Sequence, residues 1–119
     1  RALPVLLVMP ERPTAVFCYN DMTAIGLLRA ARRAGLQLPR DLSVVGFDNV
    51  PLSSYVHPSL TTIAQPMARM GREAFEMVLA LRSGDMPANG LLVDIVVQGR
   101  LLVRESTGPF RLHSEQDVQ

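Results

Sequence analysis

Residues 14–48 carry the pattern that most restricts the fold: two short apolar runs separated by one amphipathic helical pattern. The runs, residues 15–19 (AVFCY) and 42–47 (LSVVGF), contain no charged residue, as expected of strands buried on both faces. Between them, apolar residues recur at helical spacing, at positions 24, 27, 28, 31 and 34. Two buried strands joined by a helix predict a right-handed βαβ unit with parallel strands.

Both ends of the helical pattern carry recognisable signals. Asn20 and Asp21 precede the stripe, and either side chain can cap the start of a helix. Arginines at positions 29, 32 and 33 lie off the stripe near the carboxyl end, where the helix dipole favours cations. Gly35 stands where a left-handed C-cap would fall. The helix is therefore expected between these two signals.

The second half of the chain continues the alternation of strands and helices. Residues 61–65 (TTIAQ) predict a third strand, and Pro66 suits the first turn of a following helix that ends at Gly84. The three methionines of this helix, at positions 67, 70 and 77, are expected to be core. Two more short strands are predicted at residues 91–97 and 101–104.

Composition limits the class of function. The 119 residues are 48% hydrophobic and 19% charged, which is typical of one globular domain or part of one. Twelve basic and eleven acidic residues give a net charge of +1, which lacks the basic footprint of a nucleic-acid-binding domain. The apolar stretch in the first ten residues is interrupted by Pro4 and is too short to span a membrane. We expect no contact with a membrane.

Residues that could carry catalysis or bind a metal are few. Cys18 is the single cysteine, and its place inside an apolar run favours a buried structural role over a nucleophilic one. His57 and His113 do not have the close spacing of a metal pair, and solvated positions are expected for both. No phosphate-binding, metalloprotease or nucleophile-elbow motif occurs. We therefore expect no catalytic residue, metal site or cofactor, and no enzymatic activity.

Polar residues follow three of the predicted strands. Asn20, Asp48 and Gln65 come at or just after the carboxyl ends, where ligands gather in parallel sheets. A carboxylate and two carboxamides offer hydrogen-bond donors and acceptors but no nucleophile, which suits a ligand rich in hydroxyl or amine groups. Alternatively, Asn20 and Asp48 only cap turns and Gln65 lies on the surface. The pattern alone leaves both interpretations open.

Six motifs in order resemble the effector-binding domain of the lactose/galactose repressor family. They are PTAVF, the ND pair, G-L-x-L-P, VVGFD, P-x-LTT-x-x-Q and VRES, which together cover about residues 13–110. The resemblance implies an α/β fold: a Rossmann-like three-layer sandwich, here the partial C-terminal subdomain of a periplasmic-binding-protein-like fold. It divides the chain into a truncated helix or linker (1–12), this partial subdomain (13–110) and a flexible tail (111–119).

The resemblance also assigns roles to individual positions. Asn20 and Asp48 match the residues that hydrogen-bond sugar hydroxyls or a nucleobase, and Gln65 matches a further cleft residue. Met67 stands where some members place an aromatic ring against the ligand. The face around Ile25 and the loop at Tyr55 match surfaces used for dimerisation.

These assignments lead to one functional hypothesis. The chain is expected to be the effector-sensing and dimerisation part of a cytoplasmic bacterial transcriptional regulator whose effector is a small metabolite, with a sugar favoured. Operator DNA would be contacted only through an N-terminal domain absent from this chain. The alternative is a periplasmic sugar-binding receptor of a transport system; the VRES ending favours the regulator.

Overall fold

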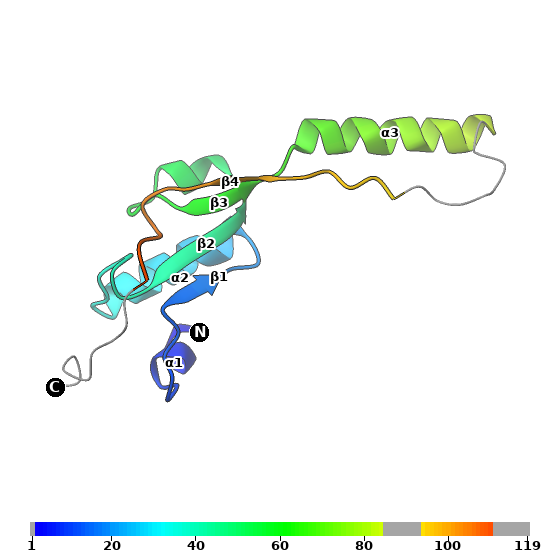
Figure 1. The fold of residues 1–119 in the computed structure, drawn as a ribbon. Helices are drawn as coiled ribbons and strands as arrows, with labels where there is room; N and C mark the ends of the chain where they lie inside the picture. Colours follow the sequence, from blue (N-terminus) through cyan, green and yellow to red (C-terminus); the bar gives the residue numbers. More distant parts are fainter. Residues whose placement is uncertain (1, 85–93, 111–119) are drawn as a thin grey trace. The chain divides into compact units, whose positions relative to one another are not determined.

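The computed structural model describes residues 2–84 and 94–110, which belong to two compact units (Figure 1). The first unit is formed by Arg1–Ala64 and Leu101–Gln119, and the second by Gln65–Arg100. The expected tail at 111–119 and the first three residues of the strand predicted at 91–97 lie outside the described residues. Residues 94–97 are not in a strand, so the described part of that prediction is wrong.

A four-stranded sheet organises the first unit. The elements in chain order are α1 (Ala2–Leu7), β1 (Ala15–Phe17), α2 (Asp21–Arg33), β2 (Ser43–Asp48), the 3-10 helix η1 (Pro51–Ser54), β3 (Thr61–Ala64) and, starting at the last residue of the second unit, β4 (Arg100–Leu102). The strand order is β1-β2-β3-β4, and both the β1–β2 and the β2–β3 pairs are parallel. The predicted parallel βαβ unit is therefore confirmed.

Helix α2 packs on β2 and, among the described residues, supplies four of the nine buried apolar residues of the core. Its buried apolar residues are four members of the predicted stripe, Ala24, Leu27, Leu28 and Ala31, whereas Ala34 is exposed. They pack against buried side chains that include Leu42, Val44 and Leu60. The C-terminal end follows the expected pattern, because Gly35 has φ +82° and its neighbour Leu36 donates its N–H to the Ala31 carbonyl.

The opposite face of the sheet carries aromatic residues. Side chains alternate along β2, so Phe47 points away from the α2 side on which Val44 and Gly46 are buried. Phe17 of β1 packs edge-on against Phe47, with ring centroids 6.4 Å apart. Phe17 is nevertheless 63% exposed, and β1 is an edge strand of the described sheet.

Helix α1 lies within the segment expected to be a truncated helix or linker. Pro4 does not prevent helix formation, because it falls in the first turn, where a missing backbone N–H costs no hydrogen bond. Leu3 is buried against the α2 core, and Leu6 and Leu7 are partly buried there. Residues 2–7 therefore contribute to the packing of the first unit.

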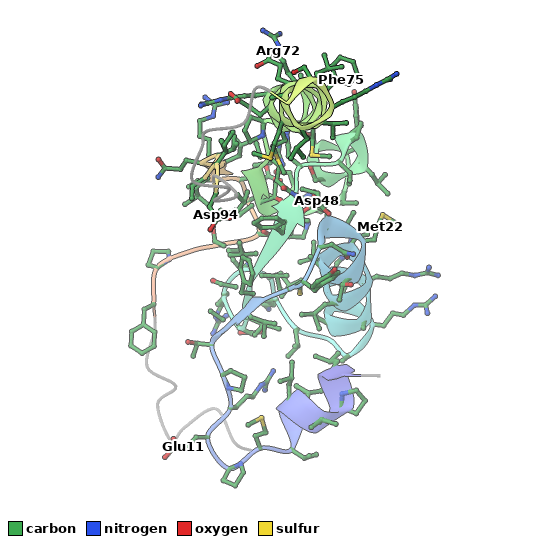
Figure 2. All side chains as sticks on the ribbon, turned by 90° about the vertical axis from the view of Figure 1, so that its right-hand side faces the viewer. Glu11, Met22, Asp48, Arg72, Phe75 and Asp94 are labelled. Atoms are coloured by element: carbon green, nitrogen blue, oxygen red, sulfur yellow. The ribbon has the colours of Figure 1, made fainter. Side chains whose placement is uncertain are left out.

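Helix α3 (Met67–Ser83) is the main element of the second unit. It ends, as predicted, at Gly84, which adopts the left-handed conformation with φ +76°. None of its residues is buried: Met67 is 64% exposed and Phe75 62% exposed, and Phe75 projects from the helix in Figure 2. The prediction that the methionines at 67, 70 and 77 are core is therefore wrong for the described residues, because helical spacing alone does not show what an apolar side packs against.

Candidate functional site

Asn20 is the N-cap of α2. Its backbone is extended, with φ −154°, and its side-chain Oδ1 accepts a hydrogen bond of 2.8 Å from the Thr23 N–H. This settles which of the two neighbouring residues caps the helix. The cap uses only Oδ1, so the Asn20 amide group is not committed to the cap and can still donate to a ligand.

Asp21 has a different role from the one that the sequence suggested. Its side chain is completely buried, and its carboxylate links β3 to the backbone that follows β2. Oδ1 accepts a 2.5 Å hydrogen bond from the Thr62 hydroxyl of β3, and Oδ2 accepts a 2.8 Å bond from the Val50 N–H that follows β2. The first residue of α2 therefore fixes the backbone directly after β2.

Gly46 allows Asp21 to come this close to β2. A Cβ atom added at Gly46 would lie 2.3 Å from Asp21 Oδ1 and 2.9 Å from a methyl group of Leu60. Real side chains do not approach to such distances, so any larger residue requires the Asp21 carboxylate to move. The glycine of the VVGFD motif is explained by this close packing.

Asp48 is the last residue of β2 and lies opposite Ala64 of β3 in the parallel register. It is half-buried, and Figure 2 shows it at the carboxyl end of the strand. Its φ is +112° and that of Asn49 is +57°, a region that non-glycine residues rarely occupy. Each such residue costs on the order of 1–3 kcal/mol and persists only where the surroundings impose it.

Several hydrogen bonds impose this conformation on residues 48–53, which we name the post-β2 segment. In addition to the Val50–Asp21 bond, the Asn49 N–H donates to the Thr62 hydroxyl at 3.4 Å, and buried Ser53 donates its hydroxyl to the Val50 carbonyl at 2.7 Å. Each of these bonds restrains the backbone next to Asp48. The carboxylate of Asp48 is thus carried by an ordered segment.

Arg104 joins the two ends of the post-β2 segment. Its Nη2 donates to Asn49 Oδ1 at 2.8 Å, and its Nη1 donates to Ser53 Oγ at 3.0 Å and to the Leu60 carbonyl at 2.8 Å. The residue is half-buried, so these bonds are only partly exposed to competition from water. A planar guanidinium can make all three bonds at once because its donors diverge in a fixed geometry.

Arg104, Glu105 and Ser106, which we name the clasp, all bind back to the sheet or to the turn before β3. Ser106 is completely buried: it donates its hydroxyl to the Val44 carbonyl at 2.6 Å and accepts the Thr61 N–H at 2.8 Å. Glu105 accepts the Ser59 N–H and hydroxyl, both at 3.0 Å. These bonds to Ser59 hold the pKa of the Glu105 carboxyl below its usual value.

The four other predicted site residues are divided between the two units. Gln65 follows β3 directly and Met67 begins α3, so both belong to the second unit, whereas Asn20 and Asp48 belong to the first. Ile25 is partly buried on α2 and packs against the core, and Tyr55 follows η1 with 84% of its surface exposed. The roles of these residues in ligand binding and dimerisation remain predictions.

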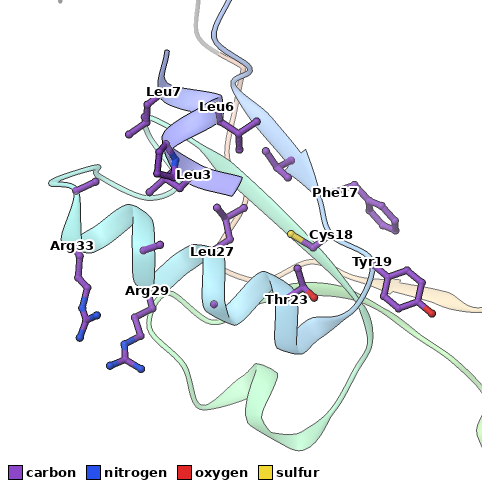
Figure 3. Close-up of a pocket in the computed structure, with 15 residues that line it drawn as sticks. Leu3, Leu6, Leu7, Phe17, Cys18, Tyr19, Thr23, Leu27, Arg29 and Arg33 are labelled. Atoms are coloured by element: carbon purple, nitrogen blue, oxygen red, sulfur yellow. The ribbon is translucent and has the colours of Figure 1, made fainter. Parts of the chain in front are cut away.

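The first unit also has a large apolar groove, which does not coincide with the predicted ligand residues. It has a volume of about 1040 Å³ and runs between α1, β1 and α2 (Figure 3). Leu3, Leu6 and Leu27 line it, and Cys18, whose thiol pKa is raised by burial, lies at its wall. Neither Asn20 nor Asp48 lines it. Most of its lining is apolar, although Thr23, Arg29 and Arg33 also border it, and it lies beside the β1 edge.

The chemistry of the remaining surface adds no further candidate. Among the described residues, no group of three or more histidine, cysteine, aspartate or glutamate side chains is arranged to hold a metal ion. The same part of the chain contains no helix that is long and apolar enough to cross a membrane. The candidate site remains the predicted pair Asn20 and Asp48; Asp21 and Arg104 bind the backbone and side chains of the segment that follows Asp48.

A family model described as a periplasmic binding protein-like domain matches residues 2–107. The chain belongs to this family. It is 43% identical over 107 residues to the HTH-type transcriptional repressor CytR of Escherichia coli (strain K12), an alignment that covers 90% of this chain and 30% of the relative. This family membership confirms the α/β, periplasmic-binding-protein-like fold and the resemblance to bacterial repressors.

Solved structures of regulators give the same result. A LacI family transcriptional regulator from Arthrobacter sp. FB24 in complex with lactose has a TM-score of 0.76 and 33% identity, covering 90% of this chain and 39% of that one. A LacI family regulator from Enterococcus faecium with bound ribose has a TM-score of 0.74 and 32% identity, covering 91% and 38%. The chain thus spans well under half the length of the proteins it matches.

Proposed function

We propose that this chain is the effector-sensing part of a bacterial transcriptional regulator that acts in the cytoplasm as a dimer. The observation that carries the proposal is Asp48, held in a positive-φ conformation at the carboxyl end of a parallel strand. Ligands of open parallel sheets bind at this edge, and strained backbone clusters at ligand sites. The match to repressors supports a regulator rather than a transport receptor.

The proposed effector is a small, hydroxyl-rich molecule. Asp48 would accept hydrogen bonds from its hydroxyl groups, and the Asn20 amide would donate to its oxygens. The relatives with bound lactose and bound ribose support a sugar. Gln65 and Met67 are proposed as further contacts, on the strength of the sequence resemblance.

Effector binding would act by changing the populations of two arrangements of the longer protein. A ligand that binds one arrangement more tightly shifts the equilibrium toward it, and operator affinity changes accordingly. Operator DNA would be contacted by another part of that protein, because this chain has a net charge of only +1. The surfaces at Ile25 and Tyr55 are proposed to contact a second copy.

The test is a titration of the longer protein that contains this chain with ribose, lactose and a ribonucleoside, using isothermal calorimetry. Asp48→Asn keeps the shape of the side chain and removes the charge, so affinity for the bound ligand should fall roughly ten- to a hundredfold. Asn20→Ala should weaken binding less, since a neutral amide is lost. Glu11→Gln is the matched control: Glu11 is exposed in the turn before β1, at the other end of the first unit from Asp48 (Figure 2).

Two results would contradict the proposal. If the unmodified protein binds none of the three compounds, the proposed effector class is wrong. If Asp48→Asn binds within twofold of the unmodified protein, Asp48 is only a turn residue; a lower melting temperature with unchanged affinity is the expected signature of that role.

A further inference from the structure

The proposed ligand role of Asp48 depends on residues that do not themselves reach a ligand. A hydrogen bond weakens steeply when its donor and acceptor are misaligned, so a ligand-binding carboxylate must be held in one orientation. Asp48 is followed by Asn49, also at positive φ, and the conformation of this pair sets the direction of the Asp48 side chain. A group that fixes Asn49 therefore influences the ligand contact.

Arg104 is well placed to do this. It binds the side chain of Asn49 through one guanidinium nitrogen, and Ser53 and the Leu60 carbonyl through the other. Its own backbone is fixed as well, because the Arg104 N–H donates to Thr61 Oγ1 at 2.9 Å in β3. The guanidinium thus links the post-β2 segment to the neighbouring strand.

We propose that Arg104 is a positioning residue for the ligand site, which orients Asp48 by fixing Asn49. This inference rests on the proposed function, since effector affinity is one of its measurable consequences. If Arg104 had a purely structural role, substituting it should have the same kind of effect as substituting Glu105 or Ser106, whose bonds go to Ser59 and to the core of the sheet.

Glu105 offers a matched control for the distinction. It is the next residue, it is also charged, and its side chain also binds across to the segment before β3, but its acceptor oxygen contacts Ser59. It also lies 4.0 Å from His57 Nδ1. Glu105→Gln therefore alters the clasp without altering the contacts to Asn49 and Ser53.

The experiment compares Arg104→Met, Arg104→Lys and Glu105→Gln in the longer protein that contains this chain. Amide hydrogen exchange of residues 48–53 reports the order of the segment without any ligand. Arg104→Met should accelerate this exchange by about tenfold or more. It should also lower, by about tenfold, the affinity for the compound that the unmodified protein binds among ribose, lactose and the ribonucleoside. Arg104→Lys, which keeps the charge but loses the diverging donors, should fold and show a smaller loss of both. Glu105→Gln should leave both within about twofold, as expected of an exposed pair.

The outcomes separate this inference from the proposed function. If no compound binds the unmodified protein, the proposed function fails, and the exchange of residues 48–53 alone decides whether Arg104 orders the segment. If exchange is unchanged in both Arg104 variants, the positioning role is overturned. It is equally overturned if exchange rises while ligand affinity stays the same, or if Glu105→Gln reproduces the effects of Arg104→Met. If Arg104→Met does not fold, the comparison of Arg104→Lys with Glu105→Gln decides by the same criteria.

Discussion

Two glycine-to-alanine substitutions in the same unit should change stability in opposite directions. Gly46→Ala adds a methyl group in β2 where Asp21 Oδ1 is 2.3 Å away, Leu60 Cδ2 2.9 Å away and Asp21 Cα 3.2 Å away. Gly26→Ala adds the same group in α2, where no atom beyond the neighbouring backbone of the helix itself lies within 4 Å. The chemical change is identical, so the difference measures the packing at each position.

The structure allows the size of each effect to be worked out. At Gly46 the carboxylate of Asp21 must move, and overpacking of this kind costs about 1–3 kcal/mol. Moving it also weakens the bonds to Thr62 and Val50, and a hydrogen bond to a charged group is worth roughly 1.5–3 kcal/mol. A loss of about 3–5 kcal/mol follows, a large part of the total stability of a small domain. Gly26→Ala should instead stabilise by about 0.5–1 kcal/mol, because alanine loses less backbone entropy in a helix.

Urea denaturation followed by far-UV circular dichroism measures both effects as shifts of the midpoint at constant slope. The variant Asp21→Ala combined with Gly46→Ala provides a further check, since removing the obstructing carboxylate should make the added methyl group cost much less than it does alone. A Gly46→Ala protein whose free energy of unfolding lies within about 0.5 kcal/mol of the parent would refute the argument. So would a double variant in which the two losses simply add.

Two further predictions concern the clasp. Ser106→Ala leaves the buried Thr61 N–H without its acceptor and should lower the free energy of unfolding by about 2–3 kcal/mol. The control, Ser54→Ala on the exposed end of η1, should change it by less than about 0.5 kcal/mol. Equal effects of the two substitutions in urea denaturation would contradict the prediction. The bonds from Ser59 lower the pKa of Glu105 below its ordinary 4.5 in the folded protein. The stability that ionised Glu105 contributes is therefore fully present above pH 4.5 and is lost as the pH falls through the lowered pKa. The melting temperature of Glu105→Gln should therefore fall less steeply as the pH is lowered than that of the unmodified protein. Identical plots of melting temperature against pH for the two proteins would show that this carboxylate does not contribute to stability.

Periodicity in the sequence was sufficient to predict the main elements of the first unit. The strand predicted at 61–65 is observed as Thr61–Ala64, and that at 42–47 as Ser43–Asp48. Four of the five predicted stripe positions of α2 are buried. These predictions succeed because each depends on local spacing and on burial against a neighbour that is close in the chain.

The parts that were not predicted depend on distant partners. Asp21 was assigned only a possible capping role, but its carboxylate binds Thr62, 41 residues away, and no local pattern indicates that partner. Arg104 was noted only as part of a family motif, and its contact with Asn49 joins residues 55 apart. The glycine in VVGFD was a usable signal, because a glycine inside a strand often marks a close approach of another group.

Whether Asn20 and Asp48 bind a ligand could not be settled by the same reasoning. Both residues lie where the sequence indicated: Asn20 ends the connection between β1 and α2, and Asp48 ends β2. Asn20 also caps its helix, so the two interpretations of this residue are compatible rather than exclusive. A cap is a local property that a sequence can reveal, whereas binding depends on the chemistry of a second molecule.

The clasp has a consequence for the order in which this unit can be completed. Ser106 bonds to Val44, 62 residues earlier, and to Thr61, 45 residues earlier, so neither bond can form until the ribosome has made the end of the segment. Contacts between residues far apart in sequence form late, since closing a long loop costs entropy. During synthesis, β1, α2 and β2 can pack together early, but the Thr61 N–H has no hydrogen-bond acceptor until Ser106 has been synthesised. A newly made chain can therefore bring β1, α2 and β2 together before Arg104 holds the post-β2 segment.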